Sequence, residues 1–446
     1  MILLDVSINS VHVTTKNNRL DYISVYQSPD KSLIGIFCIF ILMFSQLVLF
    51  DRMDSRRHLF PLVATRPVGN LRVGIYTLED KWKIIFNCIV SHWTVDHLKE
   101  KFPLNITVSA NVLVVSSNIL PDTDLIDVLL DLKVGECLLD QKGEWIASYT
   151  RNLTAFGDLE GNWENVVIFD KELRRIRYSE DIFKFNADQI VFDLGYIKKL
   201  GNFEEETGSN QVVGDQVYVE KGANVQYVHL DSSSGPIYIA AGAVIESHVT
   251  IKGPTAICRN SRVKSGARIY PNVTIGDNST VGGEINNTVI WGNSAKGHEG
   301  YLGCAVIGEG CNLGAGTTNS NLKNDWKTVK IYDYVYEDLR DTGLLKCGVI
   351  IGDQSMLGIQ SKINTGTVIG VGAQVAISKF IPKFVPDFLW LTDTQIEAYR
   401  FEAFGLMLER KAAAKHGHIT SLDKKCYKWV FDDTDELRNR IINTKK

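Results

Sequence analysis

The stretch that decides the fold is IYIAAGAVIESHVTIKGPTAICRNSRVKSGARIYPNVTIGDNSTV, residues 237–281. A helix would need apolar spacings near 3.6 and a lone half-buried strand would need a spacing of two. Neither pattern fits this stretch, and a six-residue period predicts a left-handed parallel β-helix, in which each hexad forms one side of a triangular coil. Branched apolar residues recur here at every sixth position without a break, at Ile239, Ile245, Ile251, Ile257, Val263, Ile269, Ile275 and Val281.

The same period extends beyond this stretch. It returns at Ile307 and Leu313 and again between Ile351 and Val375. The two interruptions are expected to form loops on one face of the coil, which is where solenoids often carry their binding residues. Candidate functional residues are therefore expected in these interruptions.

An α/β domain is predicted upstream of the coil, and helices are predicted after it. Between Met43 and Glu205, apolar runs alternate with helix-like stretches, which favours a mostly parallel sheet with helices on its faces. After the coil, Thr394 followed three residues later by Glu397 is a capping-box pattern that predicts a helix packed on the end of the solenoid. The charged residues after Glu409 predict a solvated helical tail.

Composition excludes several classes of protein. The chain has 446 residues and a formal net charge of −4, which argues against a nucleic-acid binder that relies on a basic face. Its 45% hydrophobic and 22% charged residues are typical of globular proteins. The eight cysteines are scattered without a CxxC pair, which predicts reduced thiols in a cytoplasmic protein.

One apolar stretch has two interpretations. Residues 32–50, SLIGIFCIFILMFSQLVLF, carry no charge and are long enough to span a bilayer, which would make them an N-terminal membrane anchor. In the alternative, which we favour, translation starts at Met43 and FSQLVLF is a strand of the α/β domain. Membrane association is then not expected.

The first interruption of the period holds the candidate catalytic residue. It contains His298 in a Gly-rich loop, followed at short range by Tyr301 and Asn312. A histidine titrates near neutral pH and can act as a general base for an attacking amine.

This segment resembles a known enzyme family. The string KGHEGYLGCAVIGEGCNLGAGTTNSN, residues 296–321, is similar to the acetyltransferase segment of the bifunctional UDP-N-acetylglucosamine pyrophosphorylase/glucosamine-1-phosphate N-acetyltransferase family. The resemblance implies that His298 is the catalytic base and that Tyr301 and Asn312 bind the amino sugar. It also implies that Ala315, Asn321 and Leu322 contact acetyl-CoA.

One expected phosphate ligand of that family is missing. The family has a basic residue twelve positions before its histidine, where this chain has Asn286. Arg268 is the substitute that we predict as a substrate ligand, with Arg262 and Lys264 as further candidates. Taken by themselves, such residues are more often solvated on the outside of a coil than bound to a ligand.

The rest of the chain resembles a variant branch of the family described from Bacteroidetes. The resemblance rests on residues 65–82, TRPVGNLRVGIYTLEDKW, on the insertion at 331–347 and on FIPKFVPDFLW near the end. It begins at QLVLFDRMD, which is the reason for favouring the Met43 start. The implied domains are an N-terminal extension at 1–42, a nucleotidyltransferase-like α/β domain at 43–205, a left-handed β-helix acyltransferase domain at 206–385 and a helical tail at 386–446.

The nucleotide-binding motif is weaker than the acetyltransferase motif. Nucleotidyltransferases wrap phosphates with a Gly-rich loop, whereas this chain offers TRPVGNLRVG, in which Arg66 and Arg72 could neutralise a triphosphate. Such enzymes use a carboxylate to hold Mg²⁺. Ser116, Ser117 and Asn118 stand at the corresponding position here, and Asp122 follows in a turn, so the metal ligands stay unknown.

The resemblance implies a transferase that makes UDP-N-acetylglucosamine. It would move acetyl from acetyl-CoA to glucosamine 1-phosphate and uridylyl from UTP, with Mg²⁺, and act as a homotrimer. The alternatives are a single transfer activity on another sugar, or a non-catalytic hexapeptide scaffold.

Overall fold

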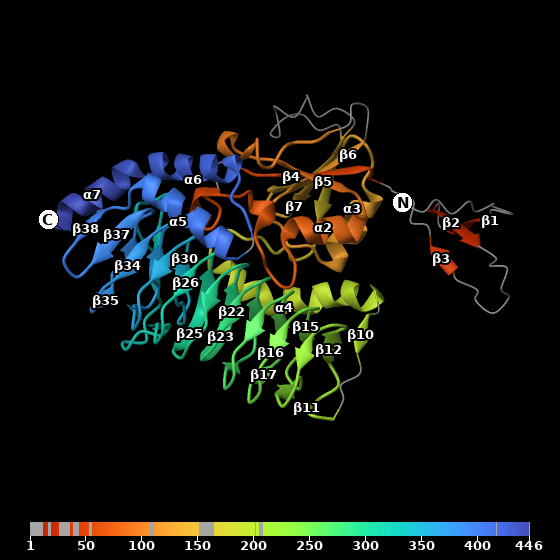
Figure 1. Cartoon of the computed structure of the whole chain (residues 1–446). Helices are drawn as coiled ribbons and strands as arrows, with labels where there is room; N and C mark the ends of the chain where they lie inside the picture. The colour runs from red at the N-terminus through yellow and green to blue at the C-terminus, as the bar shows by residue number, and fades with distance from the viewer. Residues whose placement is uncertain are drawn as a thin grey trace.

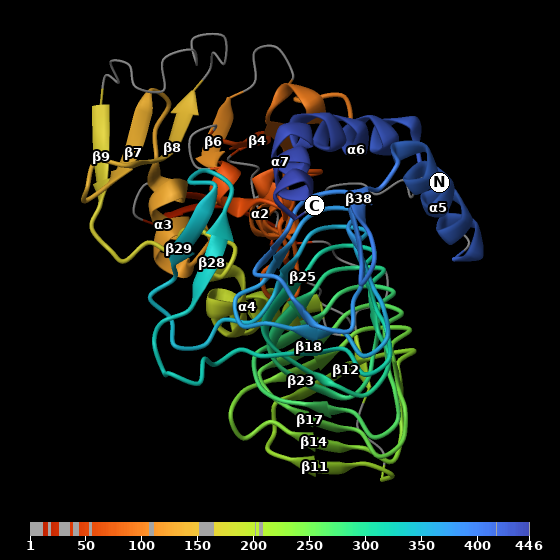
Figure 2. The same cartoon turned by 90° about the vertical axis from the view of Figure 1, so that its left-hand side faces the viewer.

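The computed structural model describes the chain in ten stretches. Three short strands, β1 (His12–Lys16), β2 (Arg19–Val25) and β3 (Ile36–Cys38), form an antiparallel sheet of their own. The main body comprises residues 44–200 (the first domain), 208–398 (the solenoid) and 401–445 (the C-terminal helices), as Figures 1 and 2 show. The described residues are 12–16, 19–25, 36–38, 44–52, 56–106, 111–150, 165–200, 202–204, 208–415 and 417–445.

The first domain is a six-stranded sheet in the order β5-β4-β6-β8-β7-β9. β8 runs antiparallel to β6 and β7, and the other neighbours are parallel. Its sequences are short apolar runs, as expected for strands covered on both faces. The strands are β4 (Gln46–Phe50), β5 (Ile89–Trp93), β6 (Val112–Ser116), β7 (Glu136–Asp140), β8 (Trp145–Thr150) and β9 (Asn165–Phe169).

Local capping fixes where two helices of this domain begin. Thr77 and Asp80 form a capping box at the start of α2 (Leu78–Phe86). The Asp122 carboxylate accepts from the backbone N–H of Leu125 and caps α3 (Thr123–Asp131).

β4 shows which interpretation of the apolar stretch holds for its last residues. It lies between β5 and β6 in the sheet, and Leu47, Val48 and Leu49 are fully buried. The prediction of a strand here is confirmed, so a membrane span cannot extend through residue 50. Residues 32–35 and 39–43 lie outside the described residues. Within the described part of the chain, no helix has both the length and the apolar character needed to cross a membrane.

The solenoid is a hexapeptide-repeat parallel β-helix, as the six-residue period predicts. Residues eighteen apart pair in register, because three hexads complete one coil: Ile239 pairs with Ile257, and Ile257 with Ile275. The inward branched side chains of successive coils form one continuous core.

The solenoid strands fall into three stacked sheets. Before the large insertion they are β10 (Phe203–Glu204), β11 (Gln211–Val213), β12 (Val217–Glu220), β13 (Asn224–Val225), β14 (His229–Asp231), β15 (Ile237–Ile239), β16 (Val244–Ile245), β17 (Thr250–Lys252), β18 (Thr255–Ile257), β19 (Arg262–Val263), β20 (Arg268–Ile269), β21 (Val273–Ile275), β22 (Thr280–Val281), β23 (Glu284–Ile290), β24 (Ala295–Lys296), β25 (Tyr301–Ile307), β26 (Asn312–Leu313) and β27 (Thr318–Asn319). After it come β30 (Ile350–Ile351), β31 (Met356–Leu357), β32 (Lys362–Ile363), β33 (Val368–Ile369), β34 (Gln374–Ala376), β35 (Phe380–Ile381), β36 (Phe384–Val385), β37 (Leu389–Thr392) and β38 (Ile396–Ala398).

A helix and a hairpin attach the first domain to the solenoid. α4 (Asp181–Ile197) packs Ile190 and Leu194 against the solenoid residues Tyr238 and Ala256. The insertion predicted to leave the coil forms a hairpin of β28 (Lys330–Asp333) and β29 (Asp338–Asp341). In Figure 2 this hairpin lies beside the first domain, where Arg340 pairs with Glu180 at 2.7 Å and Asp333 with His58 at 2.9 Å.

The end of the chain corrects one prediction. A helix starting at Thr394 is wrong, because Ile396–Ala398 forms β38, antiparallel to β37. The Thr392 hydroxyl accepts from the N–H of Gln395 and closes the turn between the two strands. Helices begin only afterwards, as α5 (Phe401–Ala414), α6 (Ser421–Asp433) and α7 (Asp435–Lys445).

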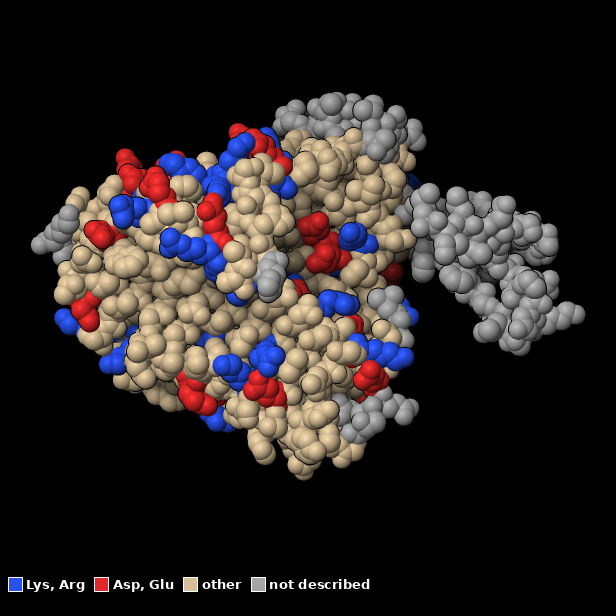
Figure 3. All heavy atoms as spheres, in the orientation of Figure 1, with Lys and Arg blue, Asp and Glu red and all other residues tan. Residues whose placement is uncertain are grey.

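The C-terminal helices also reach the first domain. The rings of Trp429 on α6 and His97 stack at 3.5 Å. Lys101 and Asp423 form an ion pair at 2.7 Å. On the face shown in Figure 3, basic and acidic side chains are interspersed, as the small net charge leads one to expect.

Candidate functional site

The predicted catalytic histidine lies at one edge of the solenoid, where the chain turns between β24 and β25. This turn, residues 297–300, is called the His298 corner. It is stacked between the corners at 282–283 and 314–317 by backbone hydrogen bonds, including Gly316 N–H to the Glu299 carbonyl at 3.2 Å. The His298 side chain is exposed. An exposed imidazole on a fixed corner can accept a proton from a bound substrate.

A buried lysine supports this corner from inside the coil. Lys296 pairs with Val281 of the preceding coil, occupies an inward position and is 3% exposed. Its ammonium donates to the carbonyls of Gly282 at 3.1 Å and His298 at 2.5 Å. Burial lowers the pKa of Lys296 to about 8. Lys296 thus holds the backbone of His298 in place by hydrogen bonds to two neutral carbonyl groups.

Two of the three basic candidates face the His298 corner. The Arg268 guanidinium lies 3.5 Å from the Glu299 carboxylate within the corner. Lys264 Nζ lies 3.9 Å from the point that a Cβ on Gly297 would occupy. Arg262 instead pairs with Glu246 at 2.9 Å. Arg268 and Lys264 are therefore placed to attract an anionic group to the corner.

Tyr301 and Asn321 contact each other beside the corner. Asn321 Nδ2 donates to the Tyr301 hydroxyl at 3.0 Å. The hydroxyl lies over Gly303, where a Cβ would come within 2.1 Å of it. Burial raises the pKa of Tyr301, so the phenol stays protonated and keeps its own O–H for a ligand.

The other predicted residues surround the corner at different positions. Asn312 is exposed on β26, on the face before the corner, and pairs with Ala295 in β24. Ala315 lies in the neighbouring corner, and its carbonyl accepts from Gln360 at 2.7 Å. Leu322 lies at the base of the insertion, bridged to Lys346. Tyr301 and Asn312 thus lie on the two faces that meet at this corner.

The two arginines predicted to bind nucleotide lie between the first domain and the solenoid. Arg66 pairs with Asp353 at 2.5 Å and with Glu309 at 3.0 Å. Arg72 pairs with Asp277 at 2.7 Å. Each guanidinium therefore already has a carboxylate of the solenoid as its partner.

The expected magnesium position does not present a metal-binding set. At the end of β6, Ser116 Oγ donates to Asn118 Oδ1 at 2.9 Å, and Asn118 donates to the Ile176 carbonyl at 3.3 Å. Asp122 is engaged in capping α3. Over the described stretches of the chain, no group of three or more His, Cys, Asp or Glu is arranged to hold a metal ion. We therefore assign no step to a metal.

Lys296 is a functional residue that the sequence motifs do not single out. The available signal was its position, because a lysine occupies the hexad site where other coils place Val281 or Leu313. A charged residue in that register indicates a hydrogen-bonding task inside the coil.

Comparison with known proteins agrees with this architecture. Residues 47–200 match the family model described as sugar nucleotidyl transferase. The chain is 27% identical over 263 residues to Bifunctional protein GlmU of Zymomonas mobilis, covering 58% of this chain and 48% of the relative. It is 35% identical over 123 residues to the Methanococcus aeolicus protein of the same name, covering 26% and 29%. The chain thus spans half or less of the length of these curated relatives.

Solved structures that match about half of the chain at low TM-scores include two acyltransferases. A UDP-N-acetylglucosamine acyltransferase of Francisella novicida is 17% identical, with a TM-score of 0.33, over 52% of this chain and 86% of that one. The AntD N-acyltransferase of Bacillus cereus is 15% identical, with a TM-score of 0.15, over 48% and 92%.

The fold and the family match define a sugar nucleotidyl transferase domain joined to a hexapeptide-repeat solenoid. Within that class, parts of the chain are similar to curated relatives named Bifunctional protein GlmU.

Proposed function

We propose that this protein is a transferase that acetylates glucosamine 1-phosphate from acetyl-CoA and joins the product to uridylate from UTP. The observation that carries the acetyl-transfer half is the His298 corner, where His298 is exposed, two cations approach the neighbouring residues Gly297 and Glu299, and a Tyr–Asn pair follows. The sugar nucleotidyl transferase match over residues 47–200 supports the uridylyl half.

In acetyl transfer, His298 accepts the proton that the sugar amine loses as it attacks the thioester carbonyl. The amine nitrogen gains a bond to the acetyl carbon, and the thiolate of CoA leaves. Arg268 and Lys264 attract the sugar phosphate, and Tyr301 offers its O–H to the sugar. Ala315, Asn321 and Leu322 line the path proposed for acetyl-CoA, and Asn312 is proposed to approach the sugar from the neighbouring face.

For uridylyl transfer, Arg66 and Arg72 are retained as proposed nucleotide contacts. Both would have to share their guanidinium with UTP while bound to Asp353 and Asp277. The acetyl-transfer half is therefore the better supported of the two, and a single acyltransfer activity is the alternative.

The assembly and the compartment are also proposals. Ile359 lies in the next coil, stacked on the corner that contains Ala315, and its side chain is 75% exposed. The Phe380 side chain is 62% exposed. A second and third copy covering these side chains would form the homotrimer and complete the sites between neighbouring coils. The seven cysteines of the main body are free and buried, which supports a cytoplasmic setting.

The test is to assay the purified protein with glucosamine 1-phosphate, acetyl-CoA, UTP and Mg²⁺, measuring CoA and pyrophosphate separately. His298→Ala should lower CoA release by about 10²–10⁴-fold, the usual contribution of a general base. His229→Ala, on β14 several coils away, is the matched control and should keep full activity.

Two outcomes would contradict the proposal. Unchanged CoA release in His298→Ala would exclude His298 as the base. CoA release by the wild type without pyrophosphate would refute the uridylyl half and leave a single acyltransferase.

A further inference from the structure

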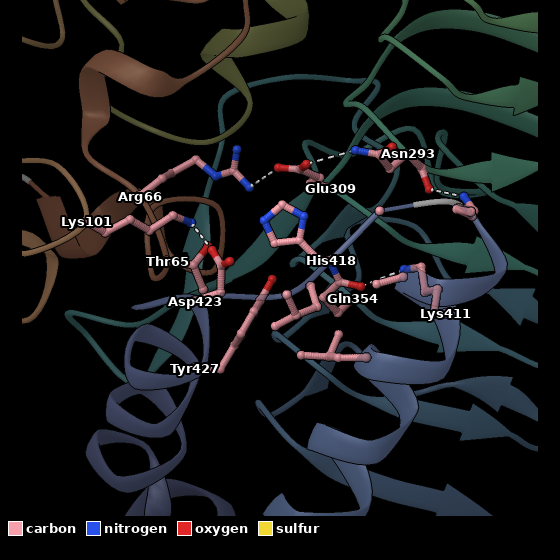
Figure 4. A pocket seen from close by; sticks show the side chains of 15 residues that line it. Thr65, Arg66, Lys101, Asn293, Glu309, Gln354, Lys411, His418, Asp423 and Tyr427 are labelled. Atoms are coloured by element: carbon pink, nitrogen blue, oxygen red, sulfur yellow. Dashed lines mark hydrogen bonds and ion pairs between the residues drawn. The ribbon is translucent and has the colours of Figure 1, made fainter. Parts of the chain in front are cut away.

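A pocket lies where the three parts of the main body meet. Its volume is about 250 Å³, and its walls come from the first domain, from solenoid corners and from α5 and α6. Figure 4 shows side chains of all three parts directed into this space, with the His418 ring among them. β24 separates the corner at Asn293, which lines this pocket, from the His298 corner, so the two sites are distinct.

Two cations of this pocket are already matched by carboxylates. Arg66 is paired with Asp353 and Glu309, as described above. Lys101 is paired with Asp423 at 2.7 Å. Two cations thus face three carboxylates, so these side chains bring a net charge of −1 to the pocket wall.

Two other cations at the pocket hydrogen-bond to neutral groups. Lys411 on α5 donates to the Gly310 carbonyl and to Gln354 Oε1, the latter at 2.6 Å. Lys415 donates to the Asn293 carbonyl at 2.8 Å. All these acceptors are neutral, and among the described residues neither lysine forms an ion pair. Because an ammonium has three donors, both lysines retain N–H groups for a ligand.

Burial makes this charge costly. It lowers the pKa of Lys411 to about 8 and also lowers the pKa of Lys415. Glu309 and Asp353 offset part of the cost of burying the Lys411 ammonium. With four cations against three carboxylates the charged side chains at the pocket still sum to +1, so an anion placed beside the two ammonium groups would offset more of that cost.

We propose that this pocket binds a small phosphate-bearing anion through Lys411 and Lys415. A volume of about 250 Å³ is below the roughly 300–1,000 Å³ typical of sites for drug-sized ligands, which favours orthophosphate or pyrophosphate over a whole nucleotide. Lysine ammonium groups are common phosphate ligands. The bound anion would tie α5 to the solenoid corners and, through the pocket walls, to the first domain.

The experiment is isothermal titration calorimetry, which measures the affinity of the full chain for sodium orthophosphate and for sodium pyrophosphate. The titrations are made at pH 7 and at constant ionic strength set with chloride. Thermal unfolding is followed in parallel. At least one of the two anions should bind and raise the midpoint of unfolding. The double variant Lys411→Gln/Lys415→Gln should bind it at least about tenfold more weakly, because two charged contacts are lost. Lys428→Gln, which removes an exposed lysine paired with Asp432 on α6, is the control and should bind as the wild type does.

Two results would overturn the proposal. One is the absence of binding by either anion to the wild type. The other is equal affinity in the wild type and the double variant. Should the double variant not fold, Lys415→Gln alone replaces it, because that side chain is exposed, and affinity equal to the wild type would again overturn the proposal.

Discussion

At the residue scale, Lys296 is a cation inside an otherwise apolar coil. The solenoid core is built largely of branched apolar side chains such as Val281, and Lys296, which pairs with Val281, brings a charge to this register. Its two hydrogen bonds go to carbonyls that the stacked strands leave available at a corner. The geometry of the His298 backbone therefore depends on one buried ammonium.

Replacing Lys296 by methionine should change how stability depends on pH. Below pH 8 the lysine is protonated in both states, so the folded protein bears the full cost of burying the charge. Between pH 8 and 10.5, the ordinary pKa of the group, the unfolded chain binds a proton that the folded chain does not, so the free energy of unfolding rises with pH.

The measurement is urea unfolding of the wild type and Lys296→Met at pH 7.5 and pH 10. The wild type should gain about 2 kcal/mol relative to the variant over this range. Other titrating groups are common to both proteins and cancel in the difference. A difference that stays constant with pH would show that the ammonium is not buried in the way described.

The residues of the site were recoverable from sequence to different degrees. His298 stood out because it interrupts a strict period in a Gly-rich loop. Lys296 did not stand out, because its role is to donate hydrogen bonds to the carbonyls of His298 and of Gly282 in the preceding coil. No local sequence pattern specifies those acceptors. The pairing of Arg66 with Asp353 joins residues 287 apart, which sequence spacing does not reveal.

At the element scale, the corners of the solenoid decide which residues fit. Gly300 has φ of +124°, and a Cβ there would lie 2.1 Å from the Thr317 carbonyl oxygen of the next coil. Gly266, at an earlier corner on the same edge, has φ of +74° and nothing within 4 Å of its Cβ position. The two glycines differ in the steric room around them, and both have positive φ.

Gly300→Ala should therefore destabilise the protein more than Gly266→Ala. Positive φ alone costs an alanine about 1–2 kcal/mol, which both variants bear. The clash at Gly300 adds about 1–3 kcal/mol, as in other overpacked sites, and should also reduce CoA release by moving the His298 corner. Thermal or urea unfolding of the two variants checks this, and equal losses of stability would contradict the stacking described for these corners.

Elements were predicted well where one short-range rule dominates. A six-residue period specifies the inward position of each strand, so the coils followed from sequence. The capping-box pattern at Thr394 predicted a helix that does not form. Trp390 pairs with Glu397 across a tight turn, so the backbone groups of this segment are already hydrogen-bonded within a strand pair. Such pairing is set by the neighbouring strand, and propensity at the turn does not determine it.

At the scale of the whole molecule, Arg66 joins the first domain to the solenoid. Its partner Asp353 is 1% exposed, and Thr65 donates to the same carboxylate at 2.5 Å. Removing the guanidinium would leave a buried carboxylate with neutral partners only, which is costly.

Arg66→Met should destabilise the protein by about 3 kcal/mol, within the range for breaking a buried ion pair. Arg57→Met is the control, because the Arg57–Asp433 pair is partly exposed and should be worth no more than about 1 kcal/mol. Calorimetric unfolding of both variants checks the difference, together with UTP binding. Full stability with weakened UTP binding would instead identify Arg66 as a nucleotide ligand.

The contact between α6 and the first domain sets an order for biosynthesis. Cys426 donates to the carbonyl of His97 across 329 residues of chain. At about 5–20 residues per second, a ribosome needs roughly 15–65 s to make the helix that covers this surface. During that interval the nascent first domain presents the His97 ring uncovered, and coils that emerge one after another separate it from its partner. A chain truncated before α6, for example by a premature stop codon, would keep the His97 ring of the first domain uncovered permanently.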